Sequence, residues 1–321
     1  GQHIGTVLCQ LLLQAYVAGL AATVDGGKQH HEQQREGDDD DGGQEYEADM
    51  AVAQQAVHNP QLRKEFFTRS LNRFVNSFKA WFDVEEFRRS DQHYNWSQTE
   101  LSKLIRYWYG GADLSKLHDL TAAVIAGEIP AGKAATASWT PPEDVLVLVP
   151  HCWFPITAAT EKANEDQIPL FGWQDDGWLT MSNDKVVNHA EIVQWFCEMR
   201  QMGFKIREIG HDKKFCREYF VGMQKAHFRI VDQPQYFYSK SEGFRHIETA
   251  AKTGKLYYMH SDAFAYCVQN VHAIEKTDDM VMYEKIEDCT RIDVFDASVF
   301  ACVRMLQNME RAAKSEGWTE E

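Results

Sequence analysis

Three strand-like runs in hairpin order restrict the fold more than any other feature of the chain. They cover residues 107–115, 120–127 and 145–154, and turn-forming residues separate them. Runs of this kind favour neighbouring antiparallel strands, because sequential strands usually pair with one another. The first half of the chain therefore already predicts a sheet.

After the third run, helical and strand-like patterns alternate. Helical periodicity marks 186–203, 212–224, 241–254, a segment capped by Ser261, and a long final stretch from Arg291. Strand-like patterns mark 204–212, 227–233, 255–259 and a strand-turn-strand over 275–288. The alternation predicts a mixed α/β sheet with helices on its faces.

The chain divides into three pieces. Residues 1–60 form a helical and acidic low-complexity segment, 61–105 a helical linker, and 106–321 the sheet domain. The apolar stretch 6–24 contains Gln10 and Gln14, so we expect a buried helix rather than a membrane span.

Charge and cysteine content exclude little. The net charge is −15, but residues 25–49 alone hold ten acidic and two basic residues. Nucleic acid binding remains open, because it depends on local patches. Seven cysteines without a Cys-x-x-Cys pair favour a reducing, cytosolic environment.

Three acids stand at positions where functional groups collect. Asp113 ends the first strand, Asp212 ends the strand at 204–212, and Asp293 lies in the first turn of the last helix. If those two strands are neighbours, both carboxylates project toward one place, to which the helix adds the third. Three converging carboxylates need cations to remain ionised. We therefore expect two Mg²⁺ or Mn²⁺ ions, about 3.5–4 Å apart, and phosphodiester hydrolysis.

Each acid also has a simpler interpretation. Asp293 suits the positive end of a helix dipole, and Asp212 suits the cap of the helix that follows. Asp113 follows Gly110 and Gly111, and packing alone explains a strand-end acid there poorly.

Six segments in the same order resemble the nuclease domain of large terminase subunits of tailed bacteriophages. They are FFTRSLNRFVNSFKAWFDVEEF, GGADLSKLHDLTA, FGWQDDGWLTMSNDKVVNHAEI with EIGHDKKF, HSDAFAYCVQNVHAIEK and RIDVFDASVFA. The resemblance covers roughly residues 62–311. It implies a ribonuclease-H-like fold and two-metal cleavage of concatemeric double-stranded DNA during genome packaging. Asp113, Asp212 and Asp293 would be the metal ligands.

The resemblance also implies partners, namely the portal and the small terminase subunit, and a place in the host cytoplasm. A ring of subunits would depend on the motor ATPase, whose fingerprint is missing: the string 127–134 has Walker-A glycine spacing but ends in Ala134, without a hydroxyl for Mg²⁺. We expect a turn between strands there, and residues 1–60 as the end of an ATPase domain or an extension.

Departures from the family pattern leave alternatives. Val294 stands where the family has Gly, and His211 replaces the usual aromatic residue, either positioning water or phosphate or serving the structure. Asp296, one turn beyond Asp293, is an alternate ligand, and Asp119 is expected to fix a turn.

DNA contacts are expected from basic side chains near the acids. The candidates are Lys213, Lys214, Lys240, Arg245 and Arg291. Solvated surface charge is the simpler interpretation for any one of them. Aromatic residues of the segment QYFYSKSEGF could also touch DNA, but Phe237 and Tyr238 are expected in the core. Two other functions remain open: another ribonuclease-H-like nuclease, such as a resolvase or transposase, and a non-catalytic docking module.

Overall fold

The computed structural model describes residues 80–315 except 116–119, 167, 184 and 213–216. Several expectations therefore lie outside the described residues. They concern the apolar stretch 6–24, the boundary at residue 60, Asp119, Lys213 and Lys214.

The three opening runs form three consecutive strands, as predicted. They are β1 (Trp108–Asp113), β2 (Thr121–Ile129) and β3 (Val145–Pro155), and each pairs antiparallel with the next. Strand β5 (Ile206–His211) lies parallel to β1 on its other side, and β6 (Ile230–Asp232) lies parallel to β5. The first strand is thus central, with antiparallel neighbours on one side and parallel ones on the other.

Short strands complete the sheets. Strand β4 (Leu179–Ser182) gives the order β4-β3-β2-β1-β5-β6, and β7 (Leu256–Tyr257) pairs with β3. A separate hairpin joins β8 (Val271–Glu275) to β9 (Val281–Lys285). This hairpin begins four residues before the predicted strand-turn-strand, because the run from Val271 belongs to a strand and not to the preceding helix. The predicted mixed sheet of ribonuclease-H type is confirmed.

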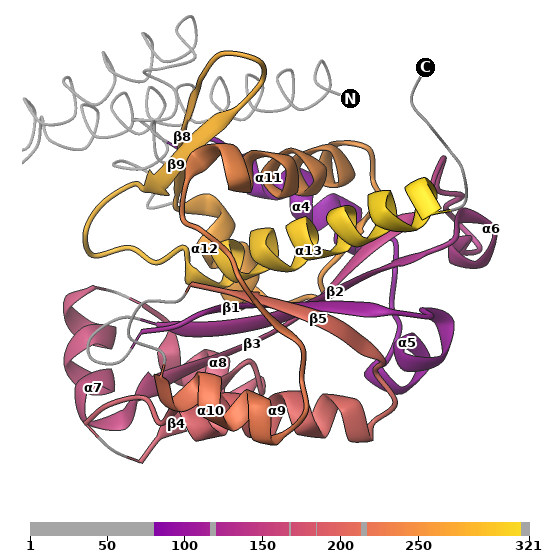
Figure 1. Ribbon diagram of the computed structural model, residues 1–321. Helices are drawn as coiled ribbons and strands as arrows, with labels where there is room; N and C mark the ends of the chain where they lie inside the picture. Colours follow the sequence, from indigo (N-terminus) through magenta and orange to yellow (C-terminus); the bar gives the residue numbers. More distant parts are fainter. Residues whose placement is uncertain (1–79, 116–119, 167, 184, 213–216, 316–321) are drawn as a thin grey trace, which may run out of the picture. The chain divides into compact units, whose positions relative to one another are not determined.

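Helices flank the sheet on both sides (Figure 1). They are α4 (Val84–Asp91), α5 (Gln98–Leu104), α6 (Ala131–Ala134), α7 (Ile156–Glu165), α8 (Leu170–Asp175), α9 (His189–Gln201), α10 (Arg217–Lys225), α11 (Phe237–Lys252), α12 (Asp262–Gln269) and α13 (Asp293–Ser315). Local chemistry sets several ends. The Ser261 hydroxyl accepts from the Phe264 N–H at 3.3 Å, and Gly203 ends α9 with a φ of 103°. None of the described helices is long and apolar enough to cross a membrane.

Two hydrophobic cores lie on opposite faces of the sheet. Alternate residues of the strands supply both, since successive side chains point to opposite faces. Ala122 and Cys152 join the core beneath α11, α12 and α13, whereas Ala123 and Trp153 join the core against α5, α9 and α10. Figure 1 shows α11 and α13 above the sheet and α9 and α10 below it. The segment 127–134 carries no phosphate loop; it is the end of β2 followed by the short α6.

Helix α13 packs directly onto the backbone of β1. A Cβ atom at Gly111 would lie 2.0 Å from the Ala297 carbonyl oxygen and 2.6 Å from the Ala301 nitrogen. No side chain fits between the two backbones, so a glycine is required at this position. This contact fixes the helix above the strand that ends in Asp113.

Replacement of Gly111 by alanine should destabilise the protein. The added methyl meets backbone atoms that cannot rotate away, and overpacking of this kind costs typically about 1–3 kcal/mol. At about 2–4 °C per kcal/mol for a domain of this size, thermal unfolding should begin clearly earlier. Gly172→Ala in α8 is the matched control, because a Cβ there meets nothing within 4 Å. A Gly111→Ala protein that melts like the parent would contradict this packing.

Candidate functional site

Asp113 and Asp212 lie side by side at one edge of the sheet. Strands β1 and β5 run parallel with Ala112 opposite His211, so the next residues, Asp113 and Asp212, lie next to each other at the carboxyl ends of the two strands. Both side chains are half-buried. The neighbouring strands expected from the sequence are confirmed.

The two acids share the face that α13 covers. A Cβ at Gly111 would meet α13, and one at Gly210 would meet Arg304 and Phe300 of the same helix. Asp113 follows Gly111 by two positions and Asp212 follows Gly210 by two, so each acid lies on the face of the glycine before it.

Asp293, the first residue of α13, lies at the same level of the sheet. Burial raises the pKa of the Cys152 thiol well above its ordinary value, with the nearby Cys267 and Asp293 as further causes. Cys152 pairs with Ala122, which pairs with Asp113. At its other end α13 reaches Glu208, whose carboxylate accepts from Asn308 Nδ2 at 2.8 Å. The helix therefore begins near the end of β1 and runs back across β5.

Asp113 and Asp212 end neighbouring strands, and Asp293 begins the helix that covers the same face, but they do not form a closed ligand set. Within the described ranges, no group of three His, Cys, Asp or Glu side chains is arranged to hold a metal ion. The donor type nevertheless fits a hard divalent cation, which prefers carboxylate oxygen. Burial, followed by the Asp293 charge, raises the pKa of the nearby Cys267 thiol.

Asp296 is held in a buried cluster one turn into α13. Its Oδ1 atom pairs with Lys240 Nζ and accepts from the Tyr283 hydroxyl, and all three side chains are largely buried. Burial, followed by the Asp296 charge, raises the pKa of Tyr283, and the Asp113 charge adds to this. The hydroxyl therefore remains a donor, and the cluster lies beside Asp113.

Lys240 was expected to contact phosphate, and the structure corrects this. The side chain is 7% exposed, its Nζ atom also donates to Gln235 Oε1 at 2.9 Å, and it lies 4.3 Å from the centre of the Tyr283 ring. The position of Lys240 thus depends on Asp296, which is distant in the sequence but in contact in the fold.

His211 points away from the acids. It is 2% exposed and its ring lies 5.5 Å from that of Tyr219, in the core against α9 and α10. Its Nδ1 atom lies 3.1 Å from the Asp212 carbonyl oxygen. These contacts favour a structural role over the positioning of water or phosphate.

The segment after Asp113 is held by residues that the sequence did not reveal. The Thr121 hydroxyl donates to the Ser115 carbonyl oxygen at 2.8 Å and accepts from its N–H at 3.1 Å. His189, at the start of α9 and 1% exposed, places its Nε2 atom 3.0 Å from the same carbonyl oxygen. A histidine directly after the Asn188 cap was a possible signal, but its partner lies 74 residues earlier.

Arg291 supports the turn that leads into α13. Its Nη1 atom donates to the carbonyl oxygens of residues 288, 289 and 290, and its Nη2 atom lies 3.1 Å from Asp166 Oδ2. At 4% exposure, the side chain positions this turn rather than projecting toward DNA.

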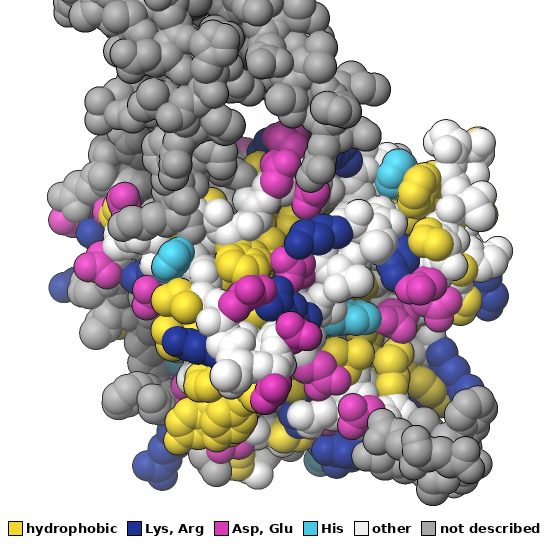
Figure 2. All heavy atoms as spheres, turned by 90° about the horizontal axis from the view of Figure 1, so that it is seen from above, with side chains coloured by type: hydrophobic (Ala, Val, Ile, Leu, Met, Phe, Trp, Pro, Cys, Tyr) yellow, Lys and Arg dark blue, Asp and Glu magenta, His cyan; other side chains and the backbone are white. Residues whose placement is uncertain are grey.

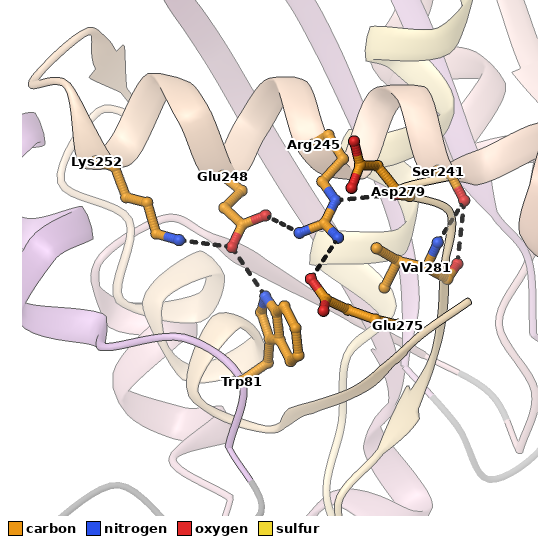
Figure 3. Close-up of polar contacts among 8 residues, drawn as sticks. All are labelled: Trp81, Ser241, Arg245, Glu248, Lys252, Glu275, Asp279 and Val281. Atoms are coloured by element: carbon orange, nitrogen blue, oxygen red, sulfur yellow. Dashed lines mark hydrogen bonds and ion pairs between the residues drawn. The ribbon is translucent and has the colours of Figure 1, made fainter. Parts of the chain in front are cut away.

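Arg245 holds the β8–β9 hairpin against α11. Its guanidinium donates to Glu248, Glu275 and the Asp279 carbonyl oxygen, at 2.7, 2.8 and 3.1 Å. Figure 3 shows that Glu248 also accepts from Trp81 and Lys252. These partners occupy the guanidinium, so we assign Arg245 to the hairpin rather than to DNA.

Arg245→Ala should loosen the hairpin without weakening DNA binding. Hydrogen bonds to charged groups are worth roughly 1.5–3 kcal/mol, so amide exchange in β8 and β9 should become about tenfold faster. Lys252→Ala is the control, because Lys252 binds the same Glu248 from an exposed position. Loss of DNA affinity in Arg245→Ala with unchanged exchange would restore the DNA-contact interpretation.

The surface around α11 carries charges of both signs and is not uniformly basic. Figure 2 shows acidic and basic side chains intermixed on the side seen from above. The expected burial of Phe237 and Tyr238 is wrong: they are 37% and 58% exposed, and Tyr238 stacks on Tyr236 at 5.4 Å. Phe237 and Tyr238 form the exposed start of α11, and the buried residues of this helix begin at Lys240.

Comparison with known proteins identifies the family of this chain. Residues 46–310 match the family model of the terminase large subunit, endonuclease domain. The large terminase subunit of Enterobacteria phage HK97 is 32% identical over 94 residues, which are 29% of this chain and 16% of that protein.

The match with a solved terminase of phage HK97 shows the same fold. The crystal structure of the HK97 large terminase matches with a TM-score of 0.58 and 21% identity, covering 80% of this chain and 50% of that one. The large terminase nuclease of the thermophilic phage G20c matches with a TM-score of 0.38 and 8% identity, covering 61% of this chain and 80% of that one. The chain thus matches half the length of the HK97 structure. Since the family model matches most of its residues, the chain belongs to the family of terminase large subunit endonuclease domains.

Proposed function

We propose that this chain is the metal-dependent endonuclease of a phage packaging terminase. Asp113, Asp212 and Asp293 would hold two divalent cations, Mg²⁺ or Mn²⁺. One observation carries the proposal: the register of β1 with β5 sets two acids side by side, on the sheet face covered by the helix that starts with the third. Family membership supports the same activity.

The protein side of the chemistry follows from the backbone. Carboxylates at the ends of two parallel strands bring negative charge to one edge, and the N-terminus of α13 offsets part of it through its dipole. Bound divalent cations would neutralise the rest, polarise a scissile phosphate and lower the pKa of bound water. The close contact of Gly111 with α13 would keep the acids in place against their mutual repulsion.

The substrate and partners follow from the family. Concatemeric double-stranded DNA is the substrate we propose, and the portal and small terminase subunit are the partners. The likeness to the HK97 large terminase subunit supports this assignment. We also propose host cytoplasm as the location, and a ring of subunits only together with an ATPase part.

Plasmid cleavage by the 321-residue chain tests the proposal. We expect linear or nicked DNA with Mg²⁺ or Mn²⁺ and none with EDTA. Absence of cleavage with either metal would favour a docking module. Preference for branched over linear duplex DNA would favour a resolvase-type nuclease.

A further inference from the structure

A polar hollow lies on the surface near the start of α13. It has a volume of about 430 Å³, and its lining includes Ser115, Lys162, Asp166, Lys285, Asp288 and Arg291. Ser115 lies two residues after Asp113, and Arg291 lies two residues before Asp293. Two of the lining residues are therefore close in the chain to two of the three acids.

Four parts of the fold build the wall of this hollow. The loop after β1 gives Ser115, α7 gives Lys162, the end of β9 gives Lys285, and the turn before α13 gives Arg291. Contacts described above fix this frame: Thr121 and His189 hold Ser115, and Arg291 holds the turn. Two of the four parts of the wall, the loop after β1 and the turn before α13, are thus held in place by contacts within the protein.

The charge of the wall favours an anion. Three cationic side chains face two carboxylates, although the chain as a whole carries −15. Asp166 is already compensated, because Arg291 Nη2 lies 3.1 Å and Lys162 Nζ 3.8 Å from its Oδ2 atom. Lys285 Nζ donates to the carbonyl oxygen of Asp288 at 3.1 Å, which holds its ammonium at the wall.

We propose that this hollow is a phosphate-binding subsite that grips the DNA backbone next to the cleaved bond. The ligand is a phosphodiester of duplex DNA, held by Lys162 and Lys285, while Arg291 supports the wall. A phosphate bound in the hollow, next to the one that is cleaved, would fix the position of the DNA strand at the three acids. The assignment rests on the proposed nuclease function, but the binding it describes requires neither metal nor cleavage.

The experiment measures DNA affinity without divalent cations. Fluorescence anisotropy of a labelled 20-base-pair duplex, in EDTA and over a series of salt concentrations, compares the full chain with Lys162→Ala, Lys285→Ala and the double variant. Each lysine that neutralises a phosphate contributes about 0.9 to the slope of log affinity against log salt. We expect affinity to fall severalfold in each single variant and further in the double, with the slope reduced by about one per lysine.

Lys225→Ala is the matched control. Lys225 is an exposed lysine at the end of α10, just before β6 begins. Since β6 runs parallel to β5, Lys225 lies toward the amino ends of these strands, whereas Asp212 follows the carboxyl end of β5. It should bind DNA like the parent. Parent-like affinity in both hollow variants, or an equal loss in the control, would overturn the proposal. Calorimetry with inorganic phosphate adds a third arm: phosphate binding that depends on Lys285, with unchanged DNA affinity, would also overturn it.

Failure of the subsite and failure of the nuclease assignment are distinguishable. If the lysine variants lose affinity but the parent cuts no plasmid with any metal, the subsite stands and the proposed function falls. If the parent cuts plasmid and both lysine variants bind DNA unchanged, the function stands and the subsite falls.

Discussion

Asp113→Asn should abolish plasmid cleavage in Mg²⁺ or Mn²⁺ while leaving the fold intact. Asparagine has the same shape as aspartate, so the half-buried position at the end of β1 remains filled. It lacks the charge that would hold a cation. Because a bound cation stabilises the transition state by several kcal/mol and each 1.36 kcal/mol is tenfold in rate, we expect a loss of at least about a hundredfold.

The same substitution at the other two acids tests whether all three act together. Asp212→Asn and Asp293→Asn should fail equally, because all three acids are proposed to hold the same pair of cations. Asp278→Asn is the control, since Asp278 is an exposed acid in the β8–β9 turn. Thermal unfolding checks that every variant is folded. Undiminished cleavage by both Asp113→Asn and Asp212→Asn would remove these residues from the proposed site.

The central sheet was predictable because its signals are local. The three opening runs hold several apolar residues in succession, and the run 204–212 has apolar residues at 204, 206 and 209, so their positions agree with β1, β2, β3 and β5. The stretch between β3 and α9 was not predicted. There α7, α8 and β4 span four to ten residues each, too few for a hydrophobic period to stand out.

The acids were identifiable for a similar reason, whereas their surroundings were not. A strand-end acid after two glycines is a local pattern, and the register of β1 with β5 then brings Asp113 to Asp212. Burial of Lys240 depends instead on Asp296, which lies in another helix, and the position of His189 depends on Ser115. Charged and polar residues look alike in sequence whether solvent or a distant partner satisfies them.

Lys240→Met should be among the most destabilising single changes in the described part of the chain. It removes the cation from a buried pair with Asp296, and the carboxylate keeps only the Tyr283 hydroxyl among the partners described above. Removal of one partner of a buried ion pair typically costs about 3–5 kcal/mol. Lys252→Met on the same helix is the control: its side chain is 56% exposed, and exposed pairs contribute about 0.2–1 kcal/mol.

The double variant Lys240→Met/Asp296→Asn should recover much of this loss. It removes both buried charges, and the asparagine oxygen still accepts from Tyr283, so no charge is left uncompensated. Urea unfolding of the four proteins of this cycle should give a coupling energy of about 0.5–3 kcal/mol. A double variant that loses the sum of the two single effects would show that Lys240 and Asp296 act independently. Recovery would mean that the uncompensated charge of Asp296, in the first turn of α13, is the main cause of the loss in Lys240→Met.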